Sequence, residues 1–281
     1  MPVAVRTFLI GAFRCHAIDD GISTYTTASF LFASASKGER EVALREAGED
    51  PKALRCSNTC LLIETQEERI LIDTGSGALS KTRSGRENLG RLFAGLDSLN
   101  VGAGDVDLVV LTHLHSDHVW GCFGPLGREP VFSSATHIIS HPEWDGAHPS
   151  LAKDLSRLRP QVELVEPDAS VASGIKLLPA PGHSAGHCAV HIESDGEDLL
   201  CIGDVVVHRL NLEQPEWTMS HEEAPQVAVA SRRRLLDRAA ETSALVHAFH
   251  MPFPSLGHIS TDGKSYAWIP VDEDPTQKEE T

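Results

Sequence analysis

Four side chains of the kinds that bind metal ions occupy six consecutive positions in the segment LTHLHSDHVWG: His113, His115, Asp117 and His118. They come directly after the apolar run VDLVVLT, which predicts a short buried strand that ends in a ligand-rich loop. Imidazole and carboxylate groups suit Zn²⁺, and also Fe, Mn or Co. A tight turn can direct alternate residues to one side and the adjacent Asp117 and His118 to another. The loop therefore predicts two metal ions held close together.

Further ligands are predicted where other strand-like runs end. His183 follows IKLLPAPG, Asp204 follows LLCIG and His250 follows ALVHAF, while the run RILI ends at Asp73. Strand ends hold loop side chains rigidly, and ligands of open α/β sheets gather there. A single histidine elsewhere is more often a hydrogen-bonded surface or core residue. On that ground we expect seven histidines to lie outside the metal site: His137, His141, His148, His191, His208, His221 and His247.

Length and charge limit the class of protein. The chain has 281 residues, and we expect one domain over residues 1–281 with a flexible acidic tail from about residue 271. A formal net charge of −16 argues against a nucleic-acid partner, and the basic run Arg232–Arg234 is expected to form a solvated helix face. No apolar run approaches the roughly 20 residues that span a bilayer, so no membrane partner is expected. The apolar start is interpreted as a first strand rather than a signal peptide, which favours the cytoplasm.

The six cysteines do not predict a second metal site. None belongs to a CxxC pair, and Cys56 and Cys60 have no second pair that would complete a thiolate zinc site. Cys188 and Cys201 lie in apolar strand-like runs. We therefore expect buried free thiols rather than disulfides.

Strands and helices are predicted along most of the chain. The runs TCLLIET and RILIDTG, separated by QEE, predict a hairpin, and Asp195 with Gly196 predicts the turn of a second hairpin. Helices are predicted over residues 87–99, 149–158 and 221–242, the last with Pro225 in its first turn. Residues 15–58 and 205–220 show neither the alternating pattern of a strand nor the helical spacing of apolar residues. We expect long loops or short helices there.

The motifs together resemble the metallo-β-lactamase superfamily. THLHSDH matches that family's T-H-x-H-x-D-H signature, and LIDTG, PGHSAGH, IGD and a late strand-end histidine occur in the family's order over roughly residues 58–260. The resemblance implies an α/β fold, the αββα sandwich, with two metal ions along the sheet edges. It implies that Asp73 does not bind a metal ion itself but orients the side chains that do. It also implies two ligand sets bridged by Asp204: His113, His115 and His183 for one ion, and Asp117, His118 and His250 for the other.

Outer segments resemble the branch of lactonases and methyl parathion hydrolase-like enzymes, namely HAIDDG, CSNTCLLIET, GDVVVH and HMPFPSLGH. That branch implies two divalent metal ions, Zn²⁺ before Fe, Mn or Co, whose shared hydroxide opens lactones or cleaves carboxylic esters of hydrophobic small molecules. Asp117 would be catalytic as well as a ligand, because it can pass the proton of the hydroxide to the leaving group. Acyl-homoserine lactonases carry a tyrosine near the site, and neither Tyr25 nor Tyr266 is expected there. A homodimer is expected from the resemblance alone.

Other functions remain open at this point. A phosphotriesterase or organophosphate hydrolase would use the same site, since one hydroxide can attack either a carbonyl carbon or a phosphorus centre. A mononuclear-iron persulfide oxidase, or a metal-binding protein without activity, would hold its metal in the same fold. His258 is expected to be a turn residue. Six aromatic residues are candidates for contact with a hydrophobic substrate: Trp120, Phe123, Trp144, Trp217, Phe249 and Phe253.

Overall fold

Two seven-stranded β-sheets form the centre of the computed structural model, which describes residues 3–77, 89–124 and 129–271. The first sheet runs in chain order through β1 (Val5–Ile10), β2 (Phe13–Tyr25), β3 (Leu54–Glu64), β4 (Arg69–Ile72), β5 (Leu108–Val110), β6 (Thr136–Ser140) and β7 (Val162–Val165). The second runs from β14 (Tyr266–Pro270) through β13 (Leu256–Thr261), β12 (Leu245–His247), β11 (Glu197–Cys201), β10 (Cys188–Ser194) and β9 (Ile175–Pro179) to β8 (Ser170–Ala172). The α-helices are α1 (Ala28–Leu31), α2 (Lys37–Glu46), α3 (Leu92–Ser98), α4 (Ser116–Val119), α5 (His141–Asp145), α6 (Ala152–Leu158), α7 (Leu210–Glu213) and α8 (Pro225–Thr242).

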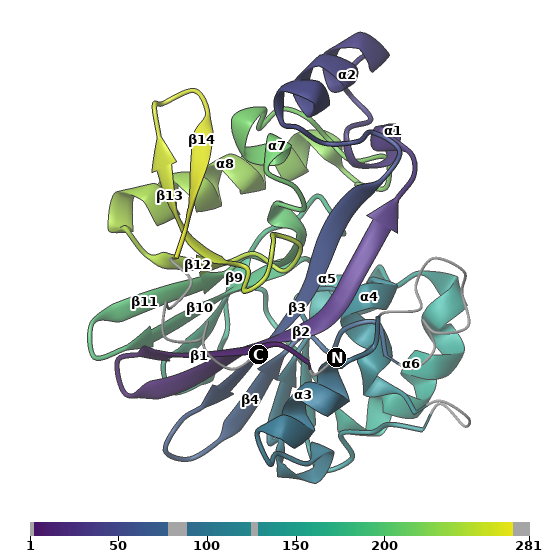
Figure 1. The fold of residues 1–281 in the computed structure, drawn as a ribbon. Helices are drawn as coiled ribbons and strands as arrows, with labels where there is room; N and C mark the ends of the chain where they lie inside the picture. The colour runs from purple at the N-terminus through teal and green to yellow at the C-terminus, as the bar shows by residue number, and fades with distance from the viewer. Residues whose placement is uncertain (1–2, 78–88, 125–128, 272–281) are drawn as a thin grey trace.

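Three apolar layers produce an αββα sandwich, as expected (Figure 1). Between the sheets, Ile63 of β3 belongs to the same buried cluster as Val190 of β10. Leu96 of α3 packs on the outer face of the first sheet, and Leu235 of α8 packs on the outer face of the second. Each fully buried aliphatic side chain contributes about 1.5–3 kcal/mol, so the three layers stabilise the sandwich together.

Strand direction brings chain segments that are far apart in sequence to one edge of the sandwich. β4, β5 and β6 are parallel, and so are β11 and β12. Because carboxyl ends of parallel neighbours meet at the same edge, Asp73 after β4 lies beside the loop after β5, and its N–H donates to the carbonyl of Val110 at 3.0 Å. The two sheets are joined at this edge, where the N–H of Ser57 donates to the carbonyl of His250 at 3.2 Å.

Most predicted elements are present, with shifts at their ends. β3 and β4 form the first hairpin, and β10 and β11 form the second around Asp195 and Gly196, whose φ values of 52° and 81° suit a two-residue turn. The last long helix begins at Pro225 rather than at residue 221, because proline is well suited to the first helical position. α3 begins only at Leu92, and residues 87 and 88 of that prediction lie outside the described residues.

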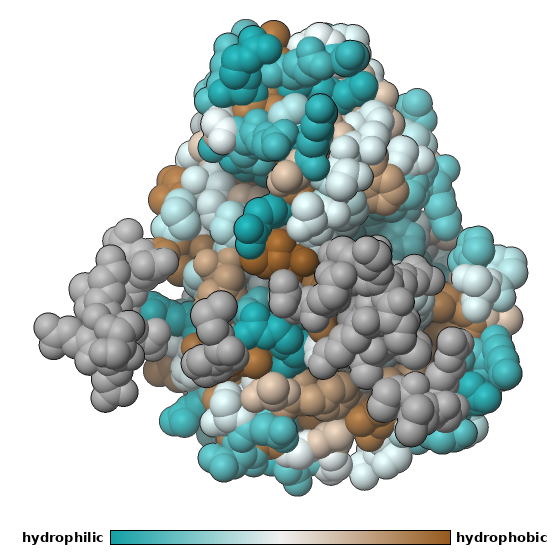
Figure 2. Space-filling view, turned by 45° about the vertical axis from the view of Figure 1, so that its right-hand side comes forward, coloured by the Kyte–Doolittle hydropathy of each residue, from teal (hydrophilic) through white to brown (hydrophobic). Residues whose placement is uncertain are grey.

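The expectation of loops or short helices over residues 15–58 was wrong for much of that segment. β2 has 13 residues and pairs with β3 along its length, with an irregularity between Asp19 and Gly21. The strand shows no alternation because it is buried on both faces, polar residues included. Buried Asp20, for example, accepts the N–H groups of Ser76 and Leu92 at 2.8 and 2.9 Å. Between the two strands, α2 begins with a capping box at Ser36 and forms a mainly hydrophilic end of the molecule (Figure 2).

The basic run on α8 is not a solvated face throughout. Arg232 is only 1% exposed, and its guanidinium donates to the carbonyls of Val205, Pro215 and Trp217 and forms an ion pair with Glu222 at 3.0 Å. A guanidinium carries five N–H donors, so enough carbonyl and carboxylate partners can compensate its burial.

Two other predictions from composition can be compared with the structure. All six cysteines are buried and unpaired, as expected for free thiols. Among the described residues, no helix combines the length and apolar character that a membrane crossing requires.

Candidate metal centre

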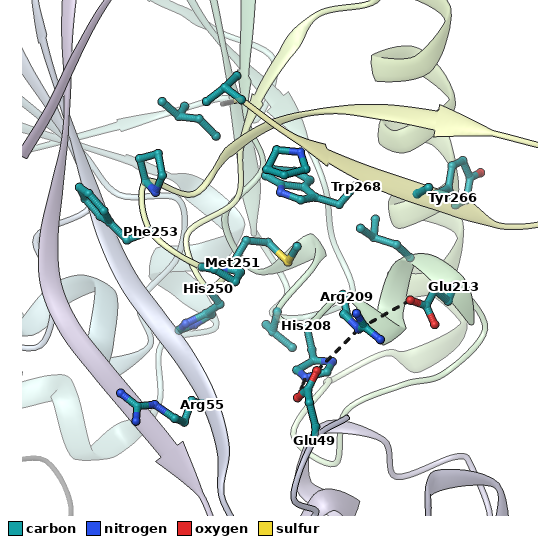
Figure 3. Close-up of a pocket in the computed structure, with 18 of the residues that line it drawn as sticks. Glu49, Arg55, His208, Arg209, Glu213, His250, Met251, Phe253, Tyr266 and Trp268 are labelled. Carbon is teal, nitrogen blue, oxygen red and sulfur yellow. Dashed lines mark hydrogen bonds and ion pairs between the residues drawn. The ribbon is translucent and has the colours of Figure 1, made fainter. Parts of the chain in front are cut away.

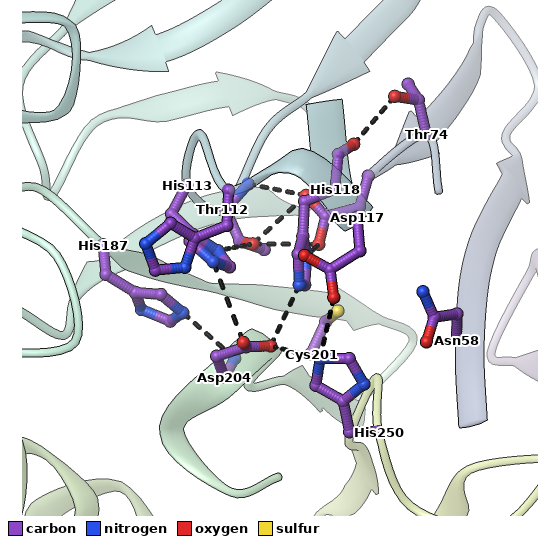
Figure 4. A network of polar contacts seen from close by, with 12 residues as sticks. Asn58, Thr74, Thr112, His113, Asp117, His118, His187, Cys201, Asp204 and His250 are labelled. Atoms are coloured by element: carbon purple, nitrogen blue, oxygen red, sulfur yellow. Dashed lines mark hydrogen bonds and ion pairs between the residues drawn. The ribbon is translucent and has the colours of Figure 1, made fainter. Parts of the chain in front are cut away.

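The seven predicted ligands lie together in two adjoining groups at the sheet edge. Figure 4 shows His113, Asp117, His118, Asp204 and His250 among them. Within each group, the candidate ligand atoms all lie within 4.8 Å of one another. Each group contains three or more donors of a kind that suits one metal ion. The first group consists of His113, His115, His183 and Asp204, and the second consists of Asp117, His118 and His250.

The carboxylate of Asp204 lies between the two groups. Its Oδ2 is 3.2 Å from Nε2 of His183 and 3.8 Å from Nε2 of His113. Its Oδ1 is 3.0 Å from Nε2 of His118 and 3.3 Å from Nε2 of His250. One oxygen therefore faces each group, which is the geometry that a bridging carboxylate requires.

The short helix α4 separates the ligands of the 113–118 loop. His115 is the N-cap residue of α4, and its Nδ1 lies 2.9 Å from Nε2 of His183 in the first group. Asp117 lies in the first turn, and its Oδ2 is 3.6 Å from Nε2 of His250 in the second group. The loop thus directs adjacent stretches of sequence to different groups, as its spacing predicted.

In three of the candidate ligand histidines, neighbouring polar groups contact the ring nitrogen Nδ1, on the side of the ring away from the site. Asp73 Oδ2 is 2.7 Å from Nδ1 of His118, and the hydroxyl of Thr112 donates to the same carboxylate at 2.8 Å. Nδ1 of His113 is 3.1 Å from the hydroxyl of Thr112, and Nδ1 of His250 donates to the carbonyl of Ser57 at 2.8 Å. Such contacts fix the ring orientation and leave Nε2 available to bind a metal ion.

Two residues that support the site were missed from the sequence. Buried Glu143 of α5 accepts the N–H of Leu114 at 2.8 Å, the hydroxyl of Ser184 at 2.6 Å and the N–H of Gly186 at 3.0 Å. It therefore joins the loop of His113 to the loop of His183, and no motif around Glu143 indicates this. Nε2 of His187 accepts the N–H of Asp204 at 3.1 Å. Its position as the second histidine of PGHSAGH was the available signal.

A glycine is needed where α5 meets the loop of His183. A Cβ atom on Gly186 would lie 2.0 Å from the backbone nitrogen of Glu143. Any side chain at this position would therefore separate the helix from the loop that carries the ligand.

Burial and neighbouring charges set different protonation states in the two groups. Burial, with the neighbouring His118, lowers the pKa of His113 well below its usual value, and burial with His183 lowers the pKa of His115 to about 3. Burial alone would raise the pKa of Asp204, but His250 and His118 outweigh it and hold that pKa well below its usual range. His113 and His115 are therefore neutral and Asp204 is ionised, the forms that act as ligands. In the second group, burial opposes protonation, but the charge of Asp204 outweighs it and raises the pKa of His118 well above its usual value. The same charge also raises the pKa of His250, so both imidazoles would release a proton when a metal ion binds.

The donor set fits two divalent ions. It combines histidine nitrogens and carboxylate oxygens, which suit Zn²⁺ and other first-row metals. Nε2 of buried His113 has no hydrogen-bond partner among the described residues and faces the same space as Asp204. A bound cation would satisfy this otherwise costly nitrogen.

An aromatic row leads from the protein surface to the first group. Tyr25 stacks on Phe30 with ring centroids 5.2 Å apart, and Phe30 stacks on His221 at 4.5 Å. His221 in turn lies 5.0 Å from His183 and 5.5 Å from His115. Phe30 is 38% exposed. Tyr25 is therefore linked to the ligand histidines through two rings, which was not expected, while His221 lies outside both ligand groups, as expected.

The six aromatic residues that were candidates for substrate contact do not line one common pocket. Phe123 and Phe249 are each 1% exposed and belong to the core, where Phe249 stacks on His118 at 4.0 Å. Trp120 and Trp144 pack against the same cluster, and Trp217 packs against a separate one beside α1 and α7.

A cavity of about 810 Å³ adjoins the second group (Figure 3). His250 lines it together with Met251, Phe253 and Trp268, between the 250–254 loop, α7 and β14. No other residue of the two ligand groups lines this cavity, so it meets the site at one end only. His258 lies in β13 rather than in a turn, and its Nδ1 donates to the carbonyl of Ala244 at 3.2 Å.

Known proteins are similar to this chain in sequence and in fold. The chain is 29% identical over 228 residues to a protein of Mycobacterium tuberculosis described as a probable metallo-hydrolase, a match that covers 68% of this chain and 70% of the relative. It is 26% identical over 218 residues to the N-acyl homoserine lactonase AiiA of Bacillus thuringiensis subsp. kurstaki, covering 71% and 83% of the two chains. The solved structure of AidC, a dizinc quorum-quenching lactonase in complex with a product, has the same fold, with a TM-score of 0.89, 24% identity and 97% and 99% coverage. The family model of the metallo-β-lactamase superfamily matches residues 53–247, well over half of the chain, and the chain therefore belongs to that superfamily.

Proposed function

We propose that the protein is a metal-dependent hydrolase that opens lactones or cleaves carboxylic esters of hydrophobic small molecules. The observation that carries the proposal is the carboxylate of Asp204, whose two oxygens face separate ligand groups. In this proposal Asp204 bridges two divalent ions, with Zn²⁺ supported by the dizinc neighbour. The remaining ligands divide as the geometry groups them: His113, His115 and His183 for one ion, and Asp117, His118 and His250 for the other.

Asp117 is the residue proposed to move a proton. Two bound ions would polarise the carbonyl oxygen of the substrate and lower the pKa of the attacking water. Asp117 is 16% exposed at its side chain, and its carboxylate lies beside the second group. It would take the proton that the water loses as its oxygen bonds to the carbonyl carbon. It would then give that proton to the alkoxy oxygen as the carbon–oxygen bond breaks.

The apolar surfaces beside the site support a hydrophobic substrate. Phe30 is partly exposed at one side of the ligands, and Phe253 lines the cavity at the other. Cavities that bind small molecules are mostly apolar and contain a few placed polar groups. Both the relative AiiA and the neighbour AidC are described as lactonases, so an N-acyl homoserine lactone is the first substrate to test.

Elemental analysis and one substitution test the two-metal proposal. We expect two divalent ions per chain and turnover of a lactone in a panel of dihydrocoumarin, an N-acyl homoserine lactone and paraoxon. His118→Ala should lose one ion and reduce kcat/KM by at least 100-fold, while His141→Ala, an exposed histidine outside both groups, should keep both ions and full activity. Full activity of His118→Ala would contradict the proposal, as would failure of the loaded protein to hydrolyse any compound of the panel.

The same measurements separate the other functions. Turnover of paraoxon but of neither lactone would assign a phosphotriesterase. One iron per chain with persulfide oxidation would assign an oxidase. The expected homodimer stays a prediction, which light scattering after gel filtration tests.

A further inference from the structure

The ligand histidine His183 differs from the other buried ligand histidines in what lies behind its ring. His113, His118 and His250 each bring the nitrogen remote from the site within 3.1 Å of a protein oxygen, on Thr112, Asp73 and Ser57 respectively. Nδ1 of His183 is buried and has no hydrogen-bond partner among the described residues. A buried N–H without an acceptor costs about 1–3 kcal/mol, so this nitrogen requires an explanation.

A second residue with a buried atom that has no partner lines a small cavity together with His183. The cavity has a volume of about 10 Å³, and both His183 and Glu222 line it. Oε2 of Glu222 is buried and, like Nδ1 of His183, has no hydrogen-bond partner among the described residues. A space of about 10–15 Å³ accommodates one water molecule, provided that polar groups surround it.

The walls of this cavity hold Glu222 in place. Arg232 donates from Nη2 to Oε1 of Glu222 at 3.0 Å, which leaves Oε2 as the oxygen without a partner. Ser231 also lines the cavity, and its hydroxyl donates to the carbonyl of Pro181 at 2.7 Å, so its oxygen can accept one further bond. A water here would have a donor in His183 and acceptors in Glu222 and Ser231.

We propose that Glu222 is a positioning residue for His183 and acts through one ordered water in this cavity. The water accepts the Nδ1–H of His183 and donates to Oε2 of Glu222. This link keeps the proton of the ring on Nδ1, so that the lone pair of Nε2 faces Asp204 and the first group. Outer partners of this kind typically change metal affinity by 10–100-fold. The inference rests on the proposed function for the role of His183 as a ligand.

A crystal structure of the metal-loaded protein at a resolution that shows ordered water tests the link directly. We expect a single density peak within hydrogen-bonding distance of Nδ1 of His183 and of Oε2 of Glu222, and the same peak in crystals of the metal-free protein. An empty cavity, or a His183 ring turned so that Nδ1 faces the metal, would overturn the inference. Two metal ions in that crystal together with an empty cavity would overturn it while leaving the proposed function intact.

Glu222→Gln tests the consequence for the metal. Its amide would give the carbonyl oxygen to Arg232 and present an NH₂ group to the water. The water would then lose the carboxylate acceptor that orients it and would face two N–H donors, one from the amide and one from His183. We expect at least a tenfold loss of affinity for one of the two ions in competition with a chromophoric chelator. Glu216→Gln, which changes the charge of a side chain 65% exposed in the same loop, should keep wild-type affinity.

A spectroscopic readout separates positioning from general destabilisation. In the Co²⁺-loaded protein, the Nδ1–H of His183 should give a paramagnetically shifted proton resonance that is protected from exchange with solvent. Glu222→Gln should abolish that protection, and Glu216→Gln should not. Wild-type protection and affinity in Glu222→Gln, whatever its melting temperature, would overturn the proposal. If Glu222→Gln does not fold, protection of this proton in the wild-type protein decides: a rapidly exchanging resonance would overturn it.

Discussion

At the scale of single residues, the carboxylate of Asp73 determines which nitrogen of His118 carries the proton. Asp73 accepts from Nδ1 of His118 at 2.7 Å and from both the N–H and the hydroxyl of Thr112 at 2.8 Å. Because both carboxylate oxygens accept, the proton of His118 stays on Nδ1 and Nε2 remains available to a metal. The backbone of Asp73 has φ 55°, a conformation that asparagine also tolerates.

Asp73→Asn therefore changes the chemistry with little change in shape. The amide NH₂ would face Nδ1 of His118 and favour the tautomer with its proton on Nε2, which cannot bind a metal. We expect the affinity for the ion of the second group to fall at least tenfold, measured by chelator competition and by metal content after gel filtration. Asp168→Asn, an exposed carboxylate, is the control. Two tightly held ions in Asp73→Asn would contradict this role.

At the scale of elements, α5 fixes the distance between the two ligand loops. Glu143 accepts from Leu114 in one loop and from Ser184 and Gly186 in the other. The hydroxyl of Ser140 caps the N-terminus of α5 and also donates to the carbonyl of Gly186 at 2.7 Å. The helix is thus attached to the loop of His183 through both its cap and its third residue.

Glu143→Gln should loosen both loops at once. One carboxylate oxygen becomes an NH₂ group that faces N–H or O–H donors, and a buried donor without an acceptor costs about 1–3 kcal/mol. We expect the free energy of unfolding to fall by that amount and hydrogen exchange to rise at Leu114 and Gly186. Asp145→Asn, an exposed residue of the same helix, should change neither. Unchanged exchange at Leu114 and Gly186 in Glu143→Gln would show that α5 does not join the loops.

Elements also show what the sequence could and could not predict. Short buried strands that end in a ligand, such as β5 before His113, carry a local apolar pattern, so the seven side chains of the two groups could be named in advance. β2 carries no such pattern, because His16 and Asp20 are buried in it by neighbours distant in sequence. Glu143 was missed for the same reason, since its partners lie 29 to 43 residues away. Arg232 was misjudged because the carbonyls that compensate its burial lie 15 to 27 residues away in the sequence, on Val205, Pro215 and Trp217.

At the scale of the whole molecule, histidines buried away from the candidate site make the stability depend on pH. His137 lies on β6 inside the first sheet and is fully buried. Burial lowers its pKa from 6.5 to about 4, and burial likewise lowers the pKa of His247 to about 3. Neither residue belongs to the two ligand groups, so their effect persists in metal-free protein.

The sign follows from where the proton binds. Between about pH 6.5 and pH 4, an unfolded chain protonates His137 and the folded protein does not. The unfolded state therefore binds more protons, and the free energy of unfolding falls as the pH falls. For a shift of this size the loss between pH 7.5 and pH 5 amounts to about 2 kcal/mol from His137.

His137→Leu isolates this contribution in urea unfolding of the metal-free protein at pH 7.5 and pH 5. The apolar side chain cannot take up a proton in either state, so the variant should lose about 2 kcal/mol less than the wild type over that interval. His141→Gln removes an exposed histidine nearby and should keep the wild-type dependence on pH. If His137→Leu lost as much stability as the wild type on acidification, His137 would already be protonated in the folded protein. Its burial within the first sheet would then have to be relieved by water or by an acceptor close to the ring.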